Sequence, residues 1–84
     1  MKEVTIYTSR FCPYCIRALQ LLKQKPVNLK QISVDGDVQA RREMMAKSRR
    51  QTVPQIWVGE RHIGGCDDLV ALDRAGELDA LLAS

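Results

Sequence analysis

The 84-residue sequence is poor in aromatic residues, with one Phe, two Tyr and one Trp. Sparse aromatics and the lack of a binding motif argue against a nucleic-acid partner, although the formal net charge is +3. The sequence also lacks a hydrophobic run long enough to cross a membrane, and its first residues lack the apolar core of a signal peptide. We therefore expect a cytoplasmic protein with no nucleic-acid and no membrane partner.

The sequence has few cysteines in absolute number, three, and that number is odd. An odd number argues against a framework of structural disulfides, which are rare in the cytosol in any case. With 45% hydrophobic and 27% charged residues, the composition is typical of a globular protein. We expect residues 1–84 to form one small domain that acts as a monomer.

The most informative feature that is present is a Cys-Pro-Tyr-Cys run that places Cys12 and Cys15 two residues apart. Two thiols at this spacing can close a disulfide with each other. The alternation of apolar and polar residues over 4–7 predicts a strand before the run. The apolar stripe over 13–24 predicts a helix after it, with Pro13 in the first helical turn. Cys12 is thereby predicted to lie at a strand-to-helix junction.

This junction predicts different roles for the two thiols. The N-terminus of a helix carries positive partial charge, which favours a thiolate at Cys12. Arg10 is the nearest cation in the sequence and is expected to support that thiolate. Cys15 lies one turn into the helix and should be more buried and protonated. We therefore predict that Cys12 is the attacking thiol and Cys15 the resolving thiol.

The remaining pattern predicts an α/β fold. Further strands are expected at 29–34, 55–58 and 61–63, and further helices at 38–48, 67–75 and 77–83. Asp37 should cap the helix over 38–48, and Cys66 or Asp67 the helix over 67–75. The first half forms a β-α-β unit, which requires parallel strands, and the second half adds an antiparallel hairpin. We predict a thioredoxin-like fold with a four-stranded mixed sheet flanked by helices.

The chain closely resembles a dithiol glutaredoxin of the small bacterial type over essentially its full length. Three motifs carry the resemblance, namely Cys12-Pro13-Tyr14-Cys15, Thr52-Val53-Pro54 and Gly64-Gly65-Cys66-Asp67-Asp68. Thioredoxins, by contrast, usually carry a Trp-Cys-Gly-Pro-Cys run. The resemblance implies an oxidoreductase that uses glutathione as reductant and acts on disulfide-containing or glutathionylated proteins.

The resemblance also implies a glutathione-binding groove. It would be lined by Tyr14, Thr52, Val53, Pro54, Gly65, Cys66 and Asp67. The backbone of Val53 would pair with the tripeptide as an added strand, and the Val53–Pro54 peptide bond is expected to be cis. The γ-glutamyl carboxylate would meet backbone N–H groups near Cys66 and Asp67, while the side chain of Asp67 or Asp68 would face the ammonium group.

One position departs from the family pattern. The family often has a lysine three residues before the first motif cysteine, where it holds the glycine carboxylate of glutathione. Here that position is Ser9, with Arg10 beside it. We expect the carboxylate contact to pass to Arg10 or to Arg50.

A zinc site is the first alternative for the cysteines. Cys12, Cys15, His62 and Cys66 form a countable ligand set. However, 46 residues separate Cys15 from His62, which is far more than in a compact zinc module. We therefore expect no metal. A cysteine near the start of a helix is more often a small packing residue than a redox thiol, so we expect Cys66 to be a packing residue.

The second alternative is a binding module that holds an iron–sulfur cluster between two copies of the chain through Cys12 and glutathione. Monothiol relatives more often have this role. The second thiol, Cys15, and the Pro-Tyr dipeptide between the two cysteines favour the oxidoreductase.

Overall fold

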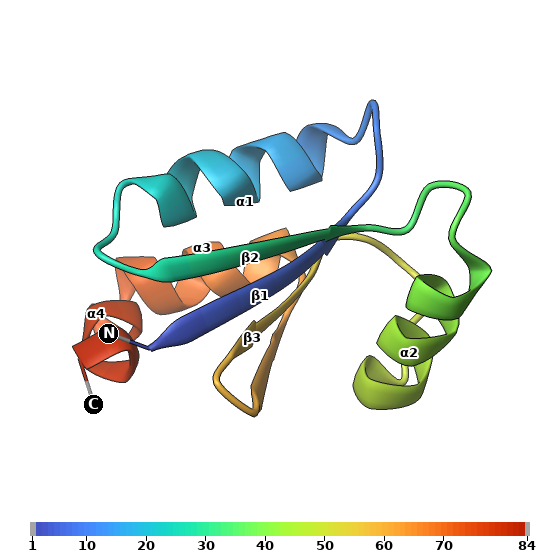
Figure 1. Ribbon diagram of the computed structural model, residues 1–84. Coiled ribbons are helices and arrows are strands. Elements are labelled where there is room, and N and C mark those ends of the chain that lie inside the picture. The colour runs from blue at the N-terminus through green and yellow to red at the C-terminus, as the bar shows by residue number, and fades with distance from the viewer. Residues whose placement is uncertain (1, 84) are drawn as a thin grey trace.

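The computed structural model describes residues 2–83, which form four strands and four helices (Figure 1). The elements in chain order are β1 (Glu3–Thr8), α1 (Pro13–Lys23), β2 (Asn28–Ser33), α2 (Val38–Ser48), β3 (Gln55–Val58), β4 (Arg61–Gly64), α3 (Cys66–Arg74) and α4 (Glu77–Ala83). All eight predicted elements are present, and their ends differ from the predicted ones by at most one residue. Among these helices none has the length and apolar character needed to cross a membrane.

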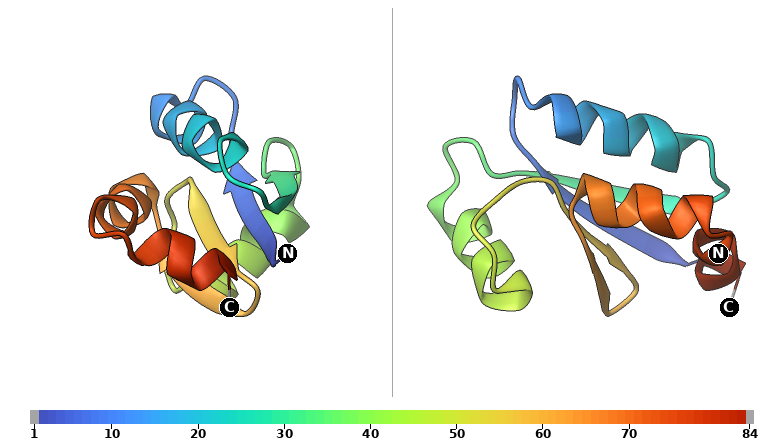
Figure 2. Two further views of the ribbon diagram at one scale, coloured as in Figure 1. Left: turned by 90° about the vertical axis from the view of Figure 1, so that its left-hand side faces the viewer. Right: turned by 180° about the vertical axis from the view of Figure 1, so that it is seen from behind.

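The four strands form one mixed sheet in the order β2-β1-β3-β4. β1 runs parallel to β2 and antiparallel to β3, and β3 pairs with β4 as an antiparallel hairpin. The predicted mixed sheet is therefore confirmed. The two views of Figure 2 show α1 and α3 together on one side of the sheet and α2 on the other.

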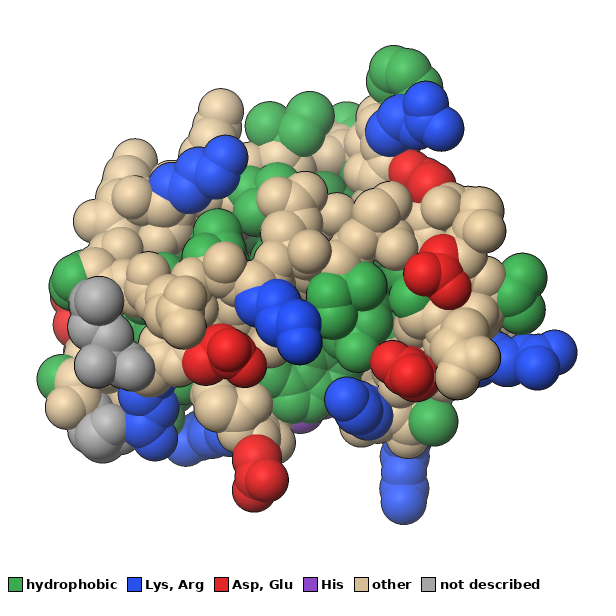
Figure 3. Space-filling view, viewed as in Figure 1, with side chains coloured by type: hydrophobic (Ala, Val, Ile, Leu, Met, Phe, Trp, Pro, Cys, Tyr) green, Lys and Arg blue, Asp and Glu red, His purple; other side chains and the backbone are tan. Residues whose placement is uncertain are grey.

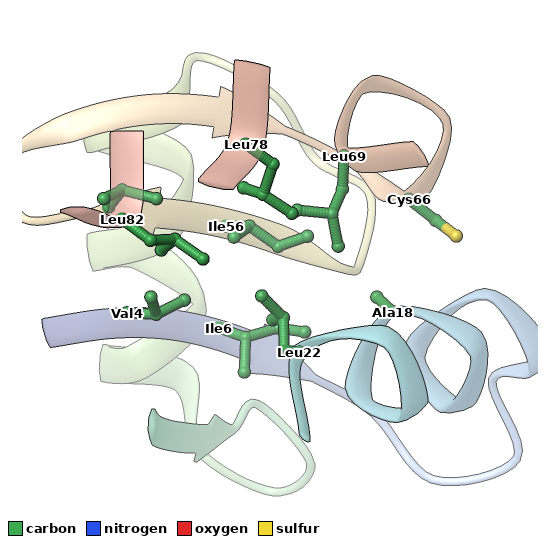
Figure 4. Packing of buried hydrophobic residues seen from close by; sticks show 10 residues of the cluster. Val4, Ile6, Ala18, Leu22, Ile56, Cys66, Leu69, Leu78 and Leu82 are labelled. Atoms are coloured by element: carbon green, nitrogen blue, oxygen red, sulfur yellow. The ribbon is translucent and has the colours of Figure 1, made fainter. Parts of the chain in front are cut away.

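The main hydrophobic core lies between the sheet and helices α1, α3 and α4 (Figure 4). Val4 and Ile6 of β1 point into it because alternate residues of a strand face the same side. Ala18 and Leu22 of α1 meet them because residues four apart share one face of a helix. Burying a leucine side chain completely stabilises a protein by roughly 1.5–3 kcal/mol, so this layer fixes α1 firmly on the sheet.

A smaller cluster lies on the opposite face of the sheet, under α2. It contains Tyr7 and Trp57 from the sheet and Met44 from the helix. The rings of Tyr7 and Trp57 pack edge to face, with centroids 5.4 Å apart. Because this cluster anchors α2 to the sheet, the segment after α2 returns to the start of β3, next to the N-terminal end of α1.

The first two helices begin as predicted. Cys12 is the N-cap of α1 and Pro13 is in its first turn. Asp37 is the N-cap of α2, where its carboxylate accepts the N–H of Ala40 at 3.0 Å.

The predicted cap of α3 is wrong. The N-cap is Gly65, neither Cys66 nor Asp67, and the backbone N–H of Gly65 donates to the carboxylate of Asp68 at 2.9 Å. The preceding Gly64 has φ of 119°, and a Cβ at that position would collide with the Asp68 carboxylate. Two adjacent glycines therefore allow the side chain of Asp68 to fold back over the start of the helix.

Candidate active site

Cys12 presents its sulfur at the N-terminus of α1. The residue is half-buried, and its sulfur accepts a hydrogen bond from the backbone N–H of Cys15 at 3.1 Å. The same sulfur lies 3.9 Å from the carbonyl oxygen of Val53. A sulfur at the positive end of a helix, with an N–H pointing at it, is in the setting that favours a nucleophilic thiolate.

Cys15 lies one turn further along and is only 1% exposed. Burial, followed by its hydrogen bond to Cys12, raises the pKa of Cys15 to about 12. Both thiols are free in the structure. The pair is therefore unequal, because Cys12 is half-buried, whereas Cys15 is almost fully buried and keeps its proton.

Cys66 is buried at the start of α3, at the edge of the main core. Figure 4 shows its sulfur pointing away from the neighbouring side chain of Leu69. Burial raises the pKa of the Cys66 thiol, and the charge of Arg17 opposes that shift. The charge of Arg17 thus affects the pKa of Cys66, a pairing that the sequence did not suggest.

His62, the fourth residue of the zinc alternative, has other partners. Its Nε2 lies 2.8 Å from Oε1 of Gln55, and its ring lies against that of Trp57, with centroids 4.9 Å apart. Burial, and after it the charge of Arg50, lower the pKa of His62. Within residues 2–83 no three His, Cys, Asp or Glu side chains gather in a way that could hold a metal ion.

A groove of about 300 Å³ runs beside the thiols. Its lining comprises Tyr14, Arg50, Thr52, Val53, Pro54, Gly65, Cys66, Asp67 and Asp68. The structure thus brings together all seven residues that the resemblance assigned to the groove. The Val53–Pro54 peptide bond is cis, as predicted. Through the carbonyl group of Val53, the groove borders directly on the sulfur of Cys12.

Arg50 and Asp68 form an ion pair on the wall of this groove, with 3.0 Å between Nη1 and Oδ2. The same carboxylate oxygen accepts the N–H of Gly65. This backbone hydrogen bond first, and Arg50 second, lower the pKa of Asp68. The groove therefore contains a cation, the exposed carboxylate of Asp67 and the N-terminus of α3, which together suit a ligand carrying both charges.

Arg10, the other candidate cation, lies elsewhere. Its Nε is 3.7 Å from Asp35, and it is not among the residues that line the groove. Asp35 also accepts the backbone N–H of Arg10 at 2.7 Å and the hydroxyl of Ser9 at 2.5 Å. These contacts, with the Ser9 hydroxyl first, hold the pKa of Asp35 below its usual value.

Asp35 is the residue that the sequence analysis missed. The Asp-Gly-Asp run in which it lies indicates only a turn. Its partners are more than 20 residues away in the chain, so no local pattern could have revealed that it ties down the loop before Cys12.

Comparison with known proteins places this chain in a family. The sequence profile of the glutaredoxin family matches residues 4–63. A glutaredoxin of Pseudomonas aeruginosa is 57% identical over 84 residues, and the alignment covers 100% of both chains. The chain belongs to the glutaredoxin family. Members of this family are thiol–disulfide oxidoreductases, and the unequal pair Cys12 and Cys15 suits that chemistry.

Solved glutaredoxin structures confirm the fold. The solution structure of a glutaredoxin from Brucella melitensis matches with a TM-score of 0.84 and 48% identity, covering 98% of this chain and 89% of that one. A crystal structure of a buckwheat glutaredoxin–glutathione complex matches with a TM-score of 0.86 and 26% identity, covering 98% of this chain and 77% of that one.

Proposed function

We propose that this chain reduces protein disulfides and glutathione mixed disulfides with glutathione as the electron donor. Cys12 is the nucleophile and Cys15 the resolving thiol. The observation that carries the proposal is the inequality of the two sulfurs beside a groove. Cys12 is reachable and receives an N–H hydrogen bond, whereas Cys15 is buried with a raised pKa.

The reaction with a protein disulfide proceeds in two exchanges. The Cys12 thiolate attacks one substrate sulfur, so that a mixed disulfide forms and the other substrate sulfur leaves as a thiolate. Cys15 then loses its proton and attacks the Cys12 sulfur, which releases the second substrate thiolate and leaves the disulfide between Cys12 and Cys15. Two glutathione thiols restore the dithiol and leave as glutathione disulfide, so two electrons pass from glutathione to the substrate.

The groove is suited to glutathione. The exposed backbone of Val53 next to the thiol can pair with an extended tripeptide as an added strand. The backbone N–H groups at the start of α3 can receive the γ-glutamyl carboxylate, and Asp67 can face the ammonium group. Arg50 lines the groove and Arg10 does not, so we assign the glycine carboxylate to Arg50. The complex of the buckwheat protein with glutathione supports this use of the fold.

We further propose that the protein acts as a monomer in the cytoplasm. The catalytic cycle needs the disulfide between Cys12 and Cys15 to be transient. Reducing thiols in the cytosol return such a disulfide to the dithiol, whereas an oxidising compartment preserves it.

The experiment is a coupled assay with the mixed disulfide of glutathione and 2-hydroxyethanethiol as substrate. Glutathione, NADPH and glutathione reductase report the glutathione disulfide that is formed. We expect turnover that depends on glutathione concentration and saturates with substrate. Turnover with dithiothreitol but none with glutathione would contradict the glutathione dependence.

A further inference from the structure

Phe11, directly before Cys12, has an unusual side chain and an unusual backbone. The residue is 94% exposed, more than the other exposed large hydrophobic residues within 2–83, which are Tyr14, Ile16 and Val38. Its φ is 54°, in the left-handed region that bulky residues seldom adopt because their Cβ crowds the backbone. Residues in such conformations concentrate at functional sites, so the position calls for a role.

The loop holds Phe11 in this exposed position. The two carboxylate oxygens of Asp35 accept the hydroxyl of Ser9 at 2.5 Å and the backbone N–H of Arg10 at 2.7 Å. Both residues that precede Phe11 are therefore tied to the loop between β2 and α2. Figure 3 shows hydrophobic and basic side chains projecting together at this corner of the molecule, over the β1–α1 and β2–α2 loops. The ring thus points into solvent from a fixed backbone.

The chemistry of the exchange brings the substrate chain to this ring. In a disulfide between Cys12 and a substrate cysteine, the two Cα atoms lie about 5.5–6 Å apart. The Cα of Phe11 is about 3.8 Å from that of Cys12, and each further substrate residue extends the chain by at most ~3.5 Å. Residues next to the substrate cysteine therefore come within reach of Phe11. Glutathione offers the ring no apolar partner, because the residues that flank its cysteine are γ-glutamate and glycine, and Phe11 is not among the residues that line the groove.

We propose that Phe11 is a specificity-determining residue that contacts an apolar side chain within two residues of the reacting cysteine in a protein disulfide. The proposal rests on the proposed function, because it concerns the substrate that Cys12 attacks. An exposed ring gains stabilisation when a second apolar group covers it, and aromatic contacts add a geometric preference to the area they bury. The contact forms in the mixed disulfide and favours apolar over polar neighbours of the substrate cysteine.

The test uses two disulfide-linked peptide dimers, one with leucine and one with serine on both sides of the cysteine. Wild type is compared with Phe11→Asn, since asparagine tolerates the left-handed backbone, and with Phe11→Tyr, which keeps the ring. Phe11→Asn should lower kcat/KM for the leucine dimer by about threefold to tenfold and change the serine dimer less than about twofold. Phe11→Tyr should retain the preference for leucine. Val38→Asn removes another exposed apolar side chain, 66% exposed, and should change neither dimer.

The mixed disulfide of glutathione and 2-hydroxyethanethiol separates this proposal from the proposed function. Phe11→Asn should reduce it as fast as wild type does, because the γ-glutamate and glycine that flank the cysteine of glutathione bear no apolar side chain. Equal losses on both dimers and on this small disulfide would show that Phe11 only shapes the loop, and no loss at all would show that it makes no contact. Either result overturns the proposal. If wild type fails with glutathione, the proposed function fails, and the leucine preference is still measured with dithiothreitol as reductant.

Discussion

The two ends of α1 differ in how their side chains are partnered. At the N-terminal end, the Cys12 sulfur is half-buried and receives one backbone N–H, and Phe11 beside it is almost fully exposed. Just beyond the C-terminal end, the ammonium group of Lys25 lies 2.9 Å from the carboxylates of both Asp73 and Asp79. An aromatic side chain in solvent and a shielded lysine reverse the usual preference for apolar residues inside and lysine outside.

This difference separates reactivity from stability along one helix. Asp73 belongs to α3 and Asp79 to α4, so Lys25 joins three helices at the end away from the thiols. The main core continues this attachment along the helix through Leu22 and Ala18. Because α1 is held over this length, its N-terminal end can leave a sulfur accessible to a substrate. The comparison predicts that changes at the N-terminal end alter activity and changes at the C-terminal end alter stability.

The largest effect is expected for Cys12→Ser. A serine hydroxyl forms no disulfide, so reduction of both the small mixed disulfide and a protein disulfide should fall to background. The coupled assay measures both, and Cys66→Ser is the matched control, since Cys66 is a buried thiol at the start of another helix and should retain most activity. Activity remaining in Cys12→Ser would mean that another thiol is the nucleophile.

Cys15→Ser should affect the reduction of the small mixed disulfide and the reduction of a protein disulfide differently. External glutathione can resolve the intermediate between Cys12 and glutathione, so reduction of the small mixed disulfide should persist. A protein mixed disulfide is released best by the internal thiol, and we expect reduction of a protein disulfide to fall by about tenfold or more. Equal loss with both substrates would contradict the assignment of Cys15 as resolving thiol.

The sequence predicted the local features of both ends and missed the long-range ones. The alternation over 4–7 and the apolar stripe over 13–24 predicted β1 and α1, because such periodicities depend only on backbone geometry. The residues that the family motifs assigned to the groove also lie together in the structure. The contacts of Asp35 with the loop before Cys12, and of Lys25 with two later helices, depend on how distant segments meet.

The capping error at α3 has a different physical cause. Propensity favours a polar or small side chain as N-cap, which pointed to Cys66 or Asp67. Gly65 takes that position because Gly64, at positive φ, leaves room for the Asp68 carboxylate to accept the Gly65 N–H. A run of two glycines allows several backbone paths, and only the packed structure selects one.

Arg50→Ala should have a moderate effect within the site. It removes a charge-assisted contact to the glycine carboxylate in an open groove, where such pairs contribute roughly 0–1 kcal/mol. We expect the KM for glutathione to rise by about threefold to fivefold, with kcat little changed. Arg10→Ala is the control, because Arg10 is also an exposed arginine but pairs with Asp35 outside the groove. An equal rise in both variants would place the carboxylate contact elsewhere.

The smallest effect on activity is expected at the other end of the helix, for Lys25→Gln. The change removes the ammonium group from Asp73 and Asp79, so the melting temperature at neutral pH should fall by a few degrees while kcat and KM stay as in wild type.

This contribution of Lys25 to stability should depend on pH. Its hydrogen bonds, the one with Asp79 first and the one with Asp73 second, raise the pKa of Lys25. The folded state therefore favours the charged form. Its contribution to stability is fully present below the usual lysine pKa of 10.5 and is lost as the pH rises through the higher value of the folded state. The difference in melting temperature between wild type and Lys25→Gln should accordingly persist through neutral pH and shrink above pH 10.5. Equal melting temperatures at neutral pH, or a loss of turnover in the variant, would break the separation between the reactive and the stabilising end of α1.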